Sequence, residues 1–214
     1  MSSYATLRKR FLKLLRMSCP RRNDTLVVVT LNNPQSYLLL RLTIDVESLF
    51  EAEVINLHIG SPRVPEIEEL SRSCSSRLHA AQRPSTLTEL KLIVYETHES
   101  MPGALYVLPF TAEEIYCYVL GEVMLGDISG LILEKSARVA YPLATTSITE
   151  IEKLTMVSKQ EAGLLSPSCR KLLEELRSRV EPQALSWLYI RTFTKHYAAR
   201  EPPRSLPSRE VKKV

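Results

Sequence analysis

Glycine is scarce in this chain, with six residues among 214. Loops that cradle phosphate groups depend on glycine, because a residue without a side chain lets backbone N–H groups come close to the ligand. Neither G-x-G-x-x-G nor G-x-x-x-x-G-K-[ST] occurs in the sequence. The sequence therefore argues against nucleotide-dependent chemistry of the familiar kinds, and we expect no cofactor.

Metal-binding patterns are also lacking. The four cysteines, Cys19, Cys74, Cys117 and Cys169, are spread along the whole chain and form no C-x-x-C pair. The four histidines have no metal-ligand spacing and stand in no nucleophile motif. We expect half-buried thiols, no metal site and no recognisable catalytic residue.

Aspartate and side-chain amides are rare as well. The chain has three aspartates, while glutamate is common among its 24 acidic residues. Scarce amides with abundant glutamate are typical of proteins adapted to heat, which predicts a thermophilic, archaeal source. A disulfide between any of the four cysteines is expected only if the source is a hyperthermophile, because intracellular proteins of other organisms rarely form them.

Long apolar runs are missing too. The longest, LVVV at 26–29 and YLLL at 37–40, are far shorter than the roughly 20 residues that a membrane-spanning helix needs. With 44% hydrophobic residues the chain can still bury a substantial core. We expect one domain or two small ones, no membrane span and a cytoplasmic location.

Charge is distributed unevenly along the chain. The net charge is +4, yet residues 1–22 hold seven basic residues and no acidic one, and residues 195–214 hold six basic and two acidic ones. Basic ends on an acidic body are typical of segments that meet phosphate or another polyanion. Loose ends that are merely kept in solution by charge would show the same pattern.

Apolar spacing predicts the elements of the first two thirds of the chain. We expect a basic amphipathic helix over 4–18, within a first segment of 1–22. The body, 23–145, should be α/β or α+β, a mixed β-sheet with flanking helices. Its expected strands are a hairpin at 25–31 and 36–44, then 53–59, 88–97, 103–110 and 131–143, and its expected helices are 65–82 and 111–125.

Helical patterns dominate the rest of the chain. An all-helical C-terminal module is expected at 146–200, with helices at 148–164, 167–180 and 182–199. The stretch SITEIEKLTMVSKQEAGLL has the outline of a helix-turn-helix, although a plain helical hairpin has the same outline. A disordered, basic, proline-rich tail is predicted for 201–214.

Basic residues near both ends are the predicted nucleic-acid contacts. In 185–200, aromatic side chains alternate with basic ones, a combination that can stack on bases and neutralise phosphates. The same spacing would also suit a buried helix face. The predicted contacts are Arg8, Lys9, Arg10, Lys13, Arg16, Arg21, Arg22, Arg191, Lys195 and Arg200.

Two short patterns suggest a nuclease. Asp45 and Glu47 follow the expected strand 36–44, and with Glu53 they could hold a metal ion. Glu89 and Lys91 form the E-x-K fragment of restriction-type nucleases, although solvated alternate positions on a strand explain the pair better. The element order over 88–143 resembles the C-terminal domain of archaeal tRNA-splicing endonuclease subunits, which would imply a non-catalytic subunit because the expected lysine is missing.

These patterns favour a non-enzymatic nucleic-acid-associated protein that uses its basic termini and its helical C-terminal module. DNA and RNA are both candidate partners. The alternative is a protein-interaction or assembly subunit of a larger complex, whose terminal helices dock on a protein partner. A metal-dependent nuclease, or a non-catalytic nuclease subunit, is the third hypothesis.

Overall fold

Five parallel strands form the centre of the molecule. The computed structural model describes residues 4–47, 49, 51–155, 157, 164–165, 167–176 and 181–198. The sheet has the strand order β3-β2-β1-β4-β5, and each neighbouring pair is parallel. The strands are β1 Thr25–Thr30, β2 Glu53–Ile59, β3 Ser76–Ala80, β4 Leu105–Val107 and β5 Arg138–Ala140.

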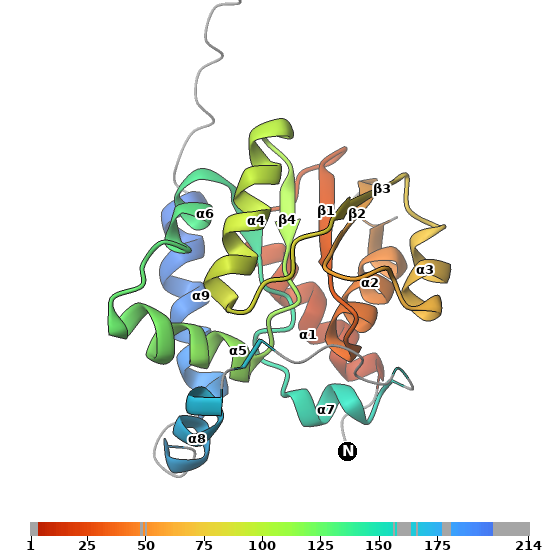
Figure 1. Cartoon of the computed structure of the whole chain (residues 1–214). Helices are drawn as coiled ribbons and strands as arrows, with labels where there is room; N and C mark the ends of the chain where they lie inside the picture. The colour runs from red at the N-terminus through yellow and green to blue at the C-terminus, as the bar shows by residue number, and fades with distance from the viewer. Residues whose placement is uncertain are drawn as a thin grey trace, which may run out of the picture.

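Helices connect the strands and cover the sheet (Figure 1). Apolar residues of α2, α3 and α7 pack in one cluster, and those of α4, α5, α6 and α9 pack in the other, while α1 contributes Leu7, Phe11 and Leu15 to the first and Leu14 to the second. They are α1 Tyr4–Met17, α2 Pro34–Glu47, α3 Pro65–Ser71, α4 Leu87–Ser100, α5 Ala112–Cys117, α6 Leu131–Ser136, α7 Ile148–Glu152, α8 Pro167–Leu176 and α9 Pro182–Ala198, with a π-helical turn η1 Tyr118–Glu122 and a 3-10 turn η2 Val123–Leu125.

Strand β1 shows how both layers are held. Val27 and Val29 belong to the cluster with α4 and α9, whereas Leu26 and Val28 belong to the cluster with α1 and α2. All four side chains are completely buried. A strand covered on both faces must be apolar throughout, which is why TLVVVT lacks the polar alternation of a half-exposed strand.

The strand order makes this a doubly wound α/β fold. The α/β class agrees with the sequence prediction, which did not specify the strand order. The chain runs outward from β1 through β2 to β3, then returns to the other side of β1 with β4 and β5. The direction reverses between β1 and β4. In open sheets of this kind, ligands bind beside such a reversal, outside the carboxyl ends of the strands.

The predicted hairpin at 25–31 and 36–44 is wrong, because its second half is helix α2. N-N-P-Q has the composition of a turn, and a short run of leucines fits a buried strand or a buried helix equally well. Pro34 opens the helix instead. Two parallel strands, β1 and β2, need a crossover connection between them, and α2 supplies it.

Three further predictions fail for related reasons. Residues 88–97 are part of helix α4, whose first turn is capped by the Thr86 hydroxyl, which accepts from Glu89 N at 3.1 Å. The helix predicted over 65–82 stops at Ser71, and edge strand β3 follows. Residues 131–143 divide into α6 and β5. The sheet is wholly parallel and not mixed, so each missed helix is a crossover.

The amphipathic first helix and strand 53–59 are confirmed. In α1 the buried side chains Leu7, Phe11, Leu14 and Leu15 recur at the predicted helical spacing. The helix predicted from residue 111 also exists, and Thr111 caps it as part of a capping box with Glu114. Such caps are local, so the sequence alone defines them.

Helix α9 packs against the body through polar as well as apolar groups. The Ser186 hydroxyl donates to the Ala144 carbonyl at 2.6 Å, and a disulfide joins Cys117 of α5 to Cys169 of α8. In Figure 1, α5 crosses α9 and α8 lies below them. Helices therefore occur within 146–200, as predicted. That these residues form a separate module stays a prediction.

A buried ion pair joins three of these helices. Lys91 Nζ of α4 lies 2.5 Å from Glu134 Oε1 of α6, with side-chain exposures of 0% and 2%. The Tyr189 hydroxyl of α9 donates to the same carboxylate oxygen at 2.7 Å, and Tyr141 donates to it as well. The lysine ammonium also lies 3.9 Å from the centre of the Tyr118 ring. This cluster fixes the relative positions of α4, α6 and α9.

No helix in the described part of the chain is long and apolar enough to cross a membrane, as predicted.

Candidate functional site

Three polar side chains stand in one row at the carboxyl edge of the sheet. The register pairs Thr30 of β1 with His58 of β2, and His58 with His79 of β3. The two imidazole rings are nearly parallel, with centroids 5.8 Å apart. Thr30 and His58 are completely buried, whereas His79 is exposed. The row therefore leads from the interior to the surface.

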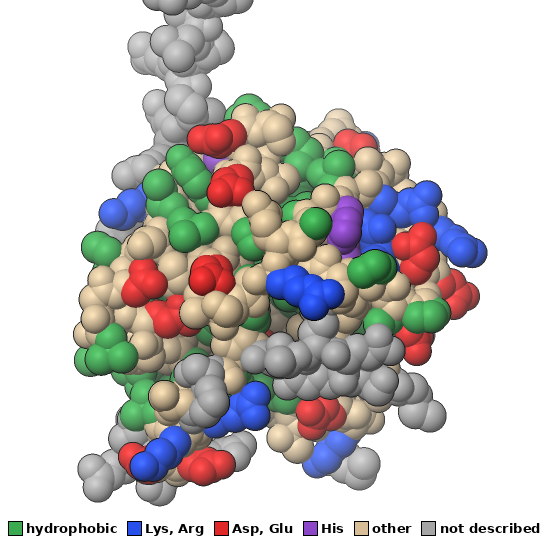
Figure 2. All heavy atoms as spheres, in the orientation of Figure 1, with side chains coloured by type: hydrophobic (Ala, Val, Ile, Leu, Met, Phe, Trp, Pro, Cys, Tyr) green, Lys and Arg blue, Asp and Glu red, His purple; other side chains and the backbone are tan. Residues whose placement is uncertain are grey.

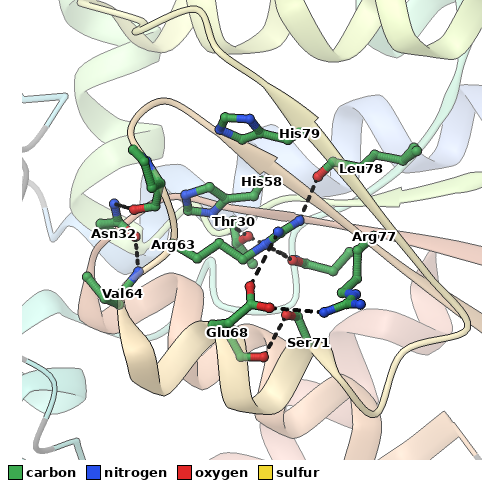
Figure 3. A network of polar contacts seen from close by, with 12 residues as sticks. Thr30, Asn32, His58, Arg63, Val64, Glu68, Ser71, Arg77, Leu78 and His79 are labelled. Atoms are coloured by element: carbon green, nitrogen blue, oxygen red, sulfur yellow. Dashed lines mark hydrogen bonds and ion pairs between the residues drawn. The ribbon is translucent and has the colours of Figure 1, made fainter.

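Hydrogen bonds define the proton positions in this row (Figure 3). His58 Nε2 lies 2.8 Å from the Ser61 carbonyl, so this nitrogen must carry the proton and donate. Its Nδ1 then accepts from the Thr30 hydroxyl at 3.1 Å. The Thr30 oxygen in turn accepts from the Asn56 amide at 2.9 Å. A neutral His58 is therefore the Nε2–H tautomer.

Arg63 extends the network to β3. Its Nε donates to Asn56 Oδ1 at 3.1 Å, and its Nη2 donates to the Leu78 carbonyl at 2.8 Å. Glu68 of α3 accepts from both Arg63, at 3.4 Å, and Arg77, at 3.0 Å. The guanidinium thus ties the segment after β2 to both strands beside it.

Asn32 fixes the same segment from the side of β1. Its amide nitrogen donates to the Ser61 hydroxyl and to the Pro62 carbonyl, each at 2.9 Å. Its oxygen accepts from the Val64 backbone N–H at 3.0 Å. The segment begins at Gly60, whose φ of 105° belongs to the left-handed region that glycine adopts without strain. Residues 60–64 are consequently pre-organised.

The exposed end of the row lies on edge strand β3. Arg77 and His79 are exposed there, as is Arg83 after the strand. Figure 2 shows a histidine side chain (purple) beside Lys and Arg side chains (blue) over this part of the surface. Positive charge beside an exposed imidazole suits an anionic partner with flat rings, such as a nucleic acid.

His79 is the exposed side chain of the row. Its Nε2 lies 3.0 Å from the Gly60 carbonyl and must therefore donate. Its Nδ1 meets no hydrogen-bond donor among the residues that the structure describes, which leaves a basic nitrogen at the surface. An imidazole held in this way can accept a proton from a bound substrate.

The predicted N-terminal contacts are partly engaged with the protein itself. Arg8 donates to the Asp45 carbonyl at 3.4 Å, Arg10 pairs with Glu150, and Lys13 lies 5.6 Å from the centre of the Trp187 ring. Arg22 pairs with Glu51 at 2.6 Å, whereas the exposed side chains of Lys9, Arg16 and Arg21 form no ion pair with any residue that the structure describes. Nucleic-acid contact by these residues stays a prediction.

Only part of the predicted C-terminal contact region lies within the residues that the structure describes. Arg191 is exposed on α9, but the side chain of Lys195 and all of Arg200 lie outside the described residues. Residues 156 and 158–163 of the helix-turn-helix outline and the tail 201–214 also lie outside them. Trp187 is half-buried and Tyr189 is buried, so these two rings serve the interior and not a base.

The nuclease residues do not form a site. Asp45 and Glu47 belong to helix α2, where residues two apart point to different sides. Asp45 accepts from the Tyr4 hydroxyl, and Glu53 is the first residue of strand β2. No group of three or more His, Cys, Asp or Glu side chains that could hold a metal ion occurs in the described ranges.

The sequence alone did not reveal the site, because strand β3 was interpreted as part of a helix over 65–82 and because the parallel pairing of β2 with β3 was not predicted. His58 and His79 are 21 positions apart, and only the parallel pairing of β2 with β3 places them side by side. One signal was available. Asn56 and His58 are polar residues within an otherwise apolar strand, and buried polar side chains must find partners.

Comparison with known proteins identifies the fold. No protein-family model matches the chain, and no curated protein matches its sequence. The U34-tRNA thiolase NcsA from Methanococcus maripaludis, solved with its [4Fe-4S] cluster, superposes with a TM-score of 0.64 and 11% identity over 92% of this chain and 79% of that one. This chain shares the fold of that thiolase.

A second structure is more distant. The NAD+ synthetase from Burkholderia pseudomallei superposes with a TM-score of 0.41 and 11% identity, covering 94% of this chain and 92% of that one. A TM-score at this level adds nothing to the fold assignment.

The prediction of a non-enzymatic nucleic-acid-associated protein is therefore wrong. That prediction rests on a helix-turn-helix module with basic arms, whereas the chain has a parallel-sheet fold that it shares with the U34-tRNA thiolase NcsA, which is an enzyme. DNA binding and membership of a complex as an assembly subunit are likewise unsupported. The arms were inferred from charge alone, and α1 is a packed helix with four buried apolar side chains.

The cysteines do not suit an iron–sulfur cluster like that of the thiolase. Such clusters are held by several cysteine thiolates brought together. Cys117 and Cys169 are bonded to each other, Cys19 is exposed after α1, and Cys74 lies before β3. The latter two lie toward the amino ends of the strands, away from the Thr30–His58–His79 row. The described cysteines therefore do not fit the ligand set of such a cluster.

Proposed function

We propose that this protein is an RNA-modifying enzyme that acts on tRNA, with the carboxyl edge of β2 and β3 as its substrate site. The observation that carries the proposal is the row Thr30–His58–His79, which stands at the ligand-binding edge of a fold shared with a tRNA thiolase. Because the chain is only 11% identical to that thiolase, the likeness shows the fold, and tRNA as the substrate is our proposal.

The site offers three functions to an RNA substrate. Arg77 and Arg83 supply exposed positive charge for the phosphate backbone. The exposed His79 ring can stack on an unpaired base, and its Nδ1 can accept a proton from a reacting group. The buried network behind it, from His58 to Arg63, holds residues 60–64 rigid, so the site needs little reorganisation when substrate binds.

The most direct test compares the modified nucleosides of tRNA. We expect tRNA from cells of the native host that lack this protein to miss at least one modified nucleoside, as measured by mass spectrometry of digested tRNA. The wild-type gene should restore the nucleoside, and His79→Ala should not. An unchanged nucleoside profile in the deletion strain would refute the proposal.

His98→Ala provides the matched control. His98 lies in the last turn of α4, at the opposite edge of the sheet, with its ring 5.7 Å from that of Tyr106. The variant makes the same histidine-to-alanine change as His79→Ala and leaves Thr30, His58 and His79 unaltered. We expect His98→Ala to complement fully, so a general effect of losing a histidine is separated from a specific effect of losing His79.

A further inference from the structure

The reversal point between β1 and β4 is the place where open parallel sheets commonly hold the phosphates of a nucleotide. Helix α2 begins after β1 and helix α5 begins after β4, so two helix amino ends flank this point. A helix amino end attracts phosphate because its first N–H groups lack partners within the helix. Whether these N–H groups are available decides what can bind.

The amino end of α2 is capped by neighbouring residues of the same chain segment. Pro34, its first residue, has no N–H, and the Ser36 N–H donates to Asn33 Oδ1 at 2.9 Å. The Ser36 hydroxyl in turn accepts from the Leu31 N–H at 2.9 Å. Asn33 is 6% exposed and Ser36 is 0% exposed. No glycine between β1 and this helix opens the backbone to a ligand.

The amino end of α5 is satisfied in the same way. The Glu114 N–H donates to the Thr111 hydroxyl oxygen at 3.3 Å, and the Thr111 N–H donates to Glu114 Oε2 at 2.9 Å. This reciprocal capping box uses donors that a phosphate would otherwise need. Thr111 is completely buried.

A buried hydrogen bond then spans the two helix ends. Gln35 Nε2 of α2 donates to Glu114 Oε1 of α5 at 2.9 Å, and the two residues are 5% and 4% exposed. Burial raises the pKa of the Glu114 carboxyl above its ordinary value, while the donors on Thr111 and Gln35 act in the opposite direction. The carboxyl therefore lies between the amino ends of α2 and α5.

We infer that Gln35 and Glu114 close the crevice between β1 and β4, so that the protein does not hold the phosphates of a free nucleotide there. Its substrate is then received on the other side of β1, at β2 and β3; this second part rests on the proposed function. Gln35 and Glu114 are thus specificity-determining residues that exclude phosphate from the reversal point.

Two measurements test the closure. Isothermal titration of the full chain with ATP, and separately with inorganic phosphate, should show no saturable binding. Hydrogen exchange should show that Glu114→Ala speeds exchange at the amides of residues 35–37 by about three- to tenfold, because a buried hydrogen bond to the neighbouring helix is lost. Glu114→Gln should leave this exchange unchanged, since an amide can keep the bond if Gln35 turns its own amide over.

Glu113→Gln is the control, because Glu113 is also buried but accepts from the Ile148 N–H of α7. It should not alter exchange at 35–37. Saturable ATP or phosphate binding that Glu114 variants change and Glu113→Gln does not would overturn the inference, as would unaltered exchange in Glu114→Ala. Loss of tRNA modification is measured separately, so the closure and the proposed function can fail independently.

Discussion

At the scale of single residues, Lys91 and Glu134 are the most deeply buried charges of opposite sign. Burial lowers the pKa of the Lys91 ammonium, and the Glu134 carboxylate acts against this effect. Glu134 Oε2 has no hydrogen-bond partner in the described part of the chain. Such a pair is costly to break, because the remaining charge is left buried and alone.

Replacing Lys91 by methionine should therefore destabilise the protein by about 3–5 kcal/mol, measured by urea unfolding. Methionine keeps the length of the side chain, so the loss reports on the charge. Lys171→Met is the control: Lys171 lies 3.8 Å from Glu175 on α8, and both are largely exposed. The control should unfold like the wild type. Equal stability of all three proteins would show that the buried pair contributes nothing.

The sequence could not reveal the role of Lys91. With 88–97 interpreted as a strand, Lys91 and Glu89 appeared to be solvated alternate positions. In helix α4, Glu89 is exposed while Lys91 faces the interior. Positions two apart share a face on a strand and not on a helix, so one wrong element type reverses the predicted burial. His58 was missed for a different reason: its strand was predicted correctly, but its partners come from other strands whose pairing the sequence does not reveal.

At the scale of elements, predictions that depend on local chemistry are the accurate ones. Thr111 and its capping box mark the start of α5, and the spacing of Leu7, Phe11 and Leu14 marks α1. The failures concern short apolar segments such as 36–44, where length and composition fit both a strand and a helix. Only the parallel sheet resolves them, because it requires a helix between consecutive strands.

The Cys117–Cys169 disulfide links α8 to α5 across 52 residues of sequence. Removing it by Cys117→Ser with Cys169→Ser should cost about 2–4 kcal/mol, because the unfolded chain regains the entropy of an open loop. The measurement is urea unfolding with and without reductant. Reductant should weaken the wild type and leave the double variant unaffected. A double variant as stable as the oxidised wild type would contradict this role.

At the scale of the whole molecule, one ion pair connects the beginning of the sheet to its last strand. Arg138 of β5 donates to both carboxylate oxygens of Asp24, at 2.9 and 2.8 Å, and to the Cys19 carbonyl at 2.8 Å. Burial by itself would raise the pKa of the Asp24 carboxyl, but hydrogen bonds from Arg138 and from the Arg21 backbone hold it below its ordinary value.

Asp24→Asn should lower the free energy of unfolding by about 1.5–3 kcal/mol near neutral pH. Because the folded-state pKa of Asp24 is lowered, the carboxylate stabilises the fold above the ordinary aspartate pKa. This contribution is lost as the pH falls through the lowered value. The difference between wild type and variant should thus shrink below about pH 4. A difference independent of pH would show that the charge is not involved.

The whole-molecule arrangement also separates the two regions that matter for function. The edge of β2 and β3 presents exposed basic and imidazole groups, whereas the reversal point between β1 and β4 is buried and internally bonded. The strand order creates both regions, and it cannot be predicted from any single segment of the sequence. The charge of the termini indicated a polyanionic partner, but the surface that we assign to it lies on β3.

Hydrogen exchange of the full chain with and without tRNA tests the central claim most directly. We predict slower exchange in residues 76–84, which contain His79 and Arg83, when tRNA is present, and no change in residues 31–37 at the closed crevice. His79→Ala should reduce the protection, and His98→Ala should not. Absence of protection in 76–84, with tRNA bound elsewhere on the protein or not at all, would contradict the assignment of the substrate site.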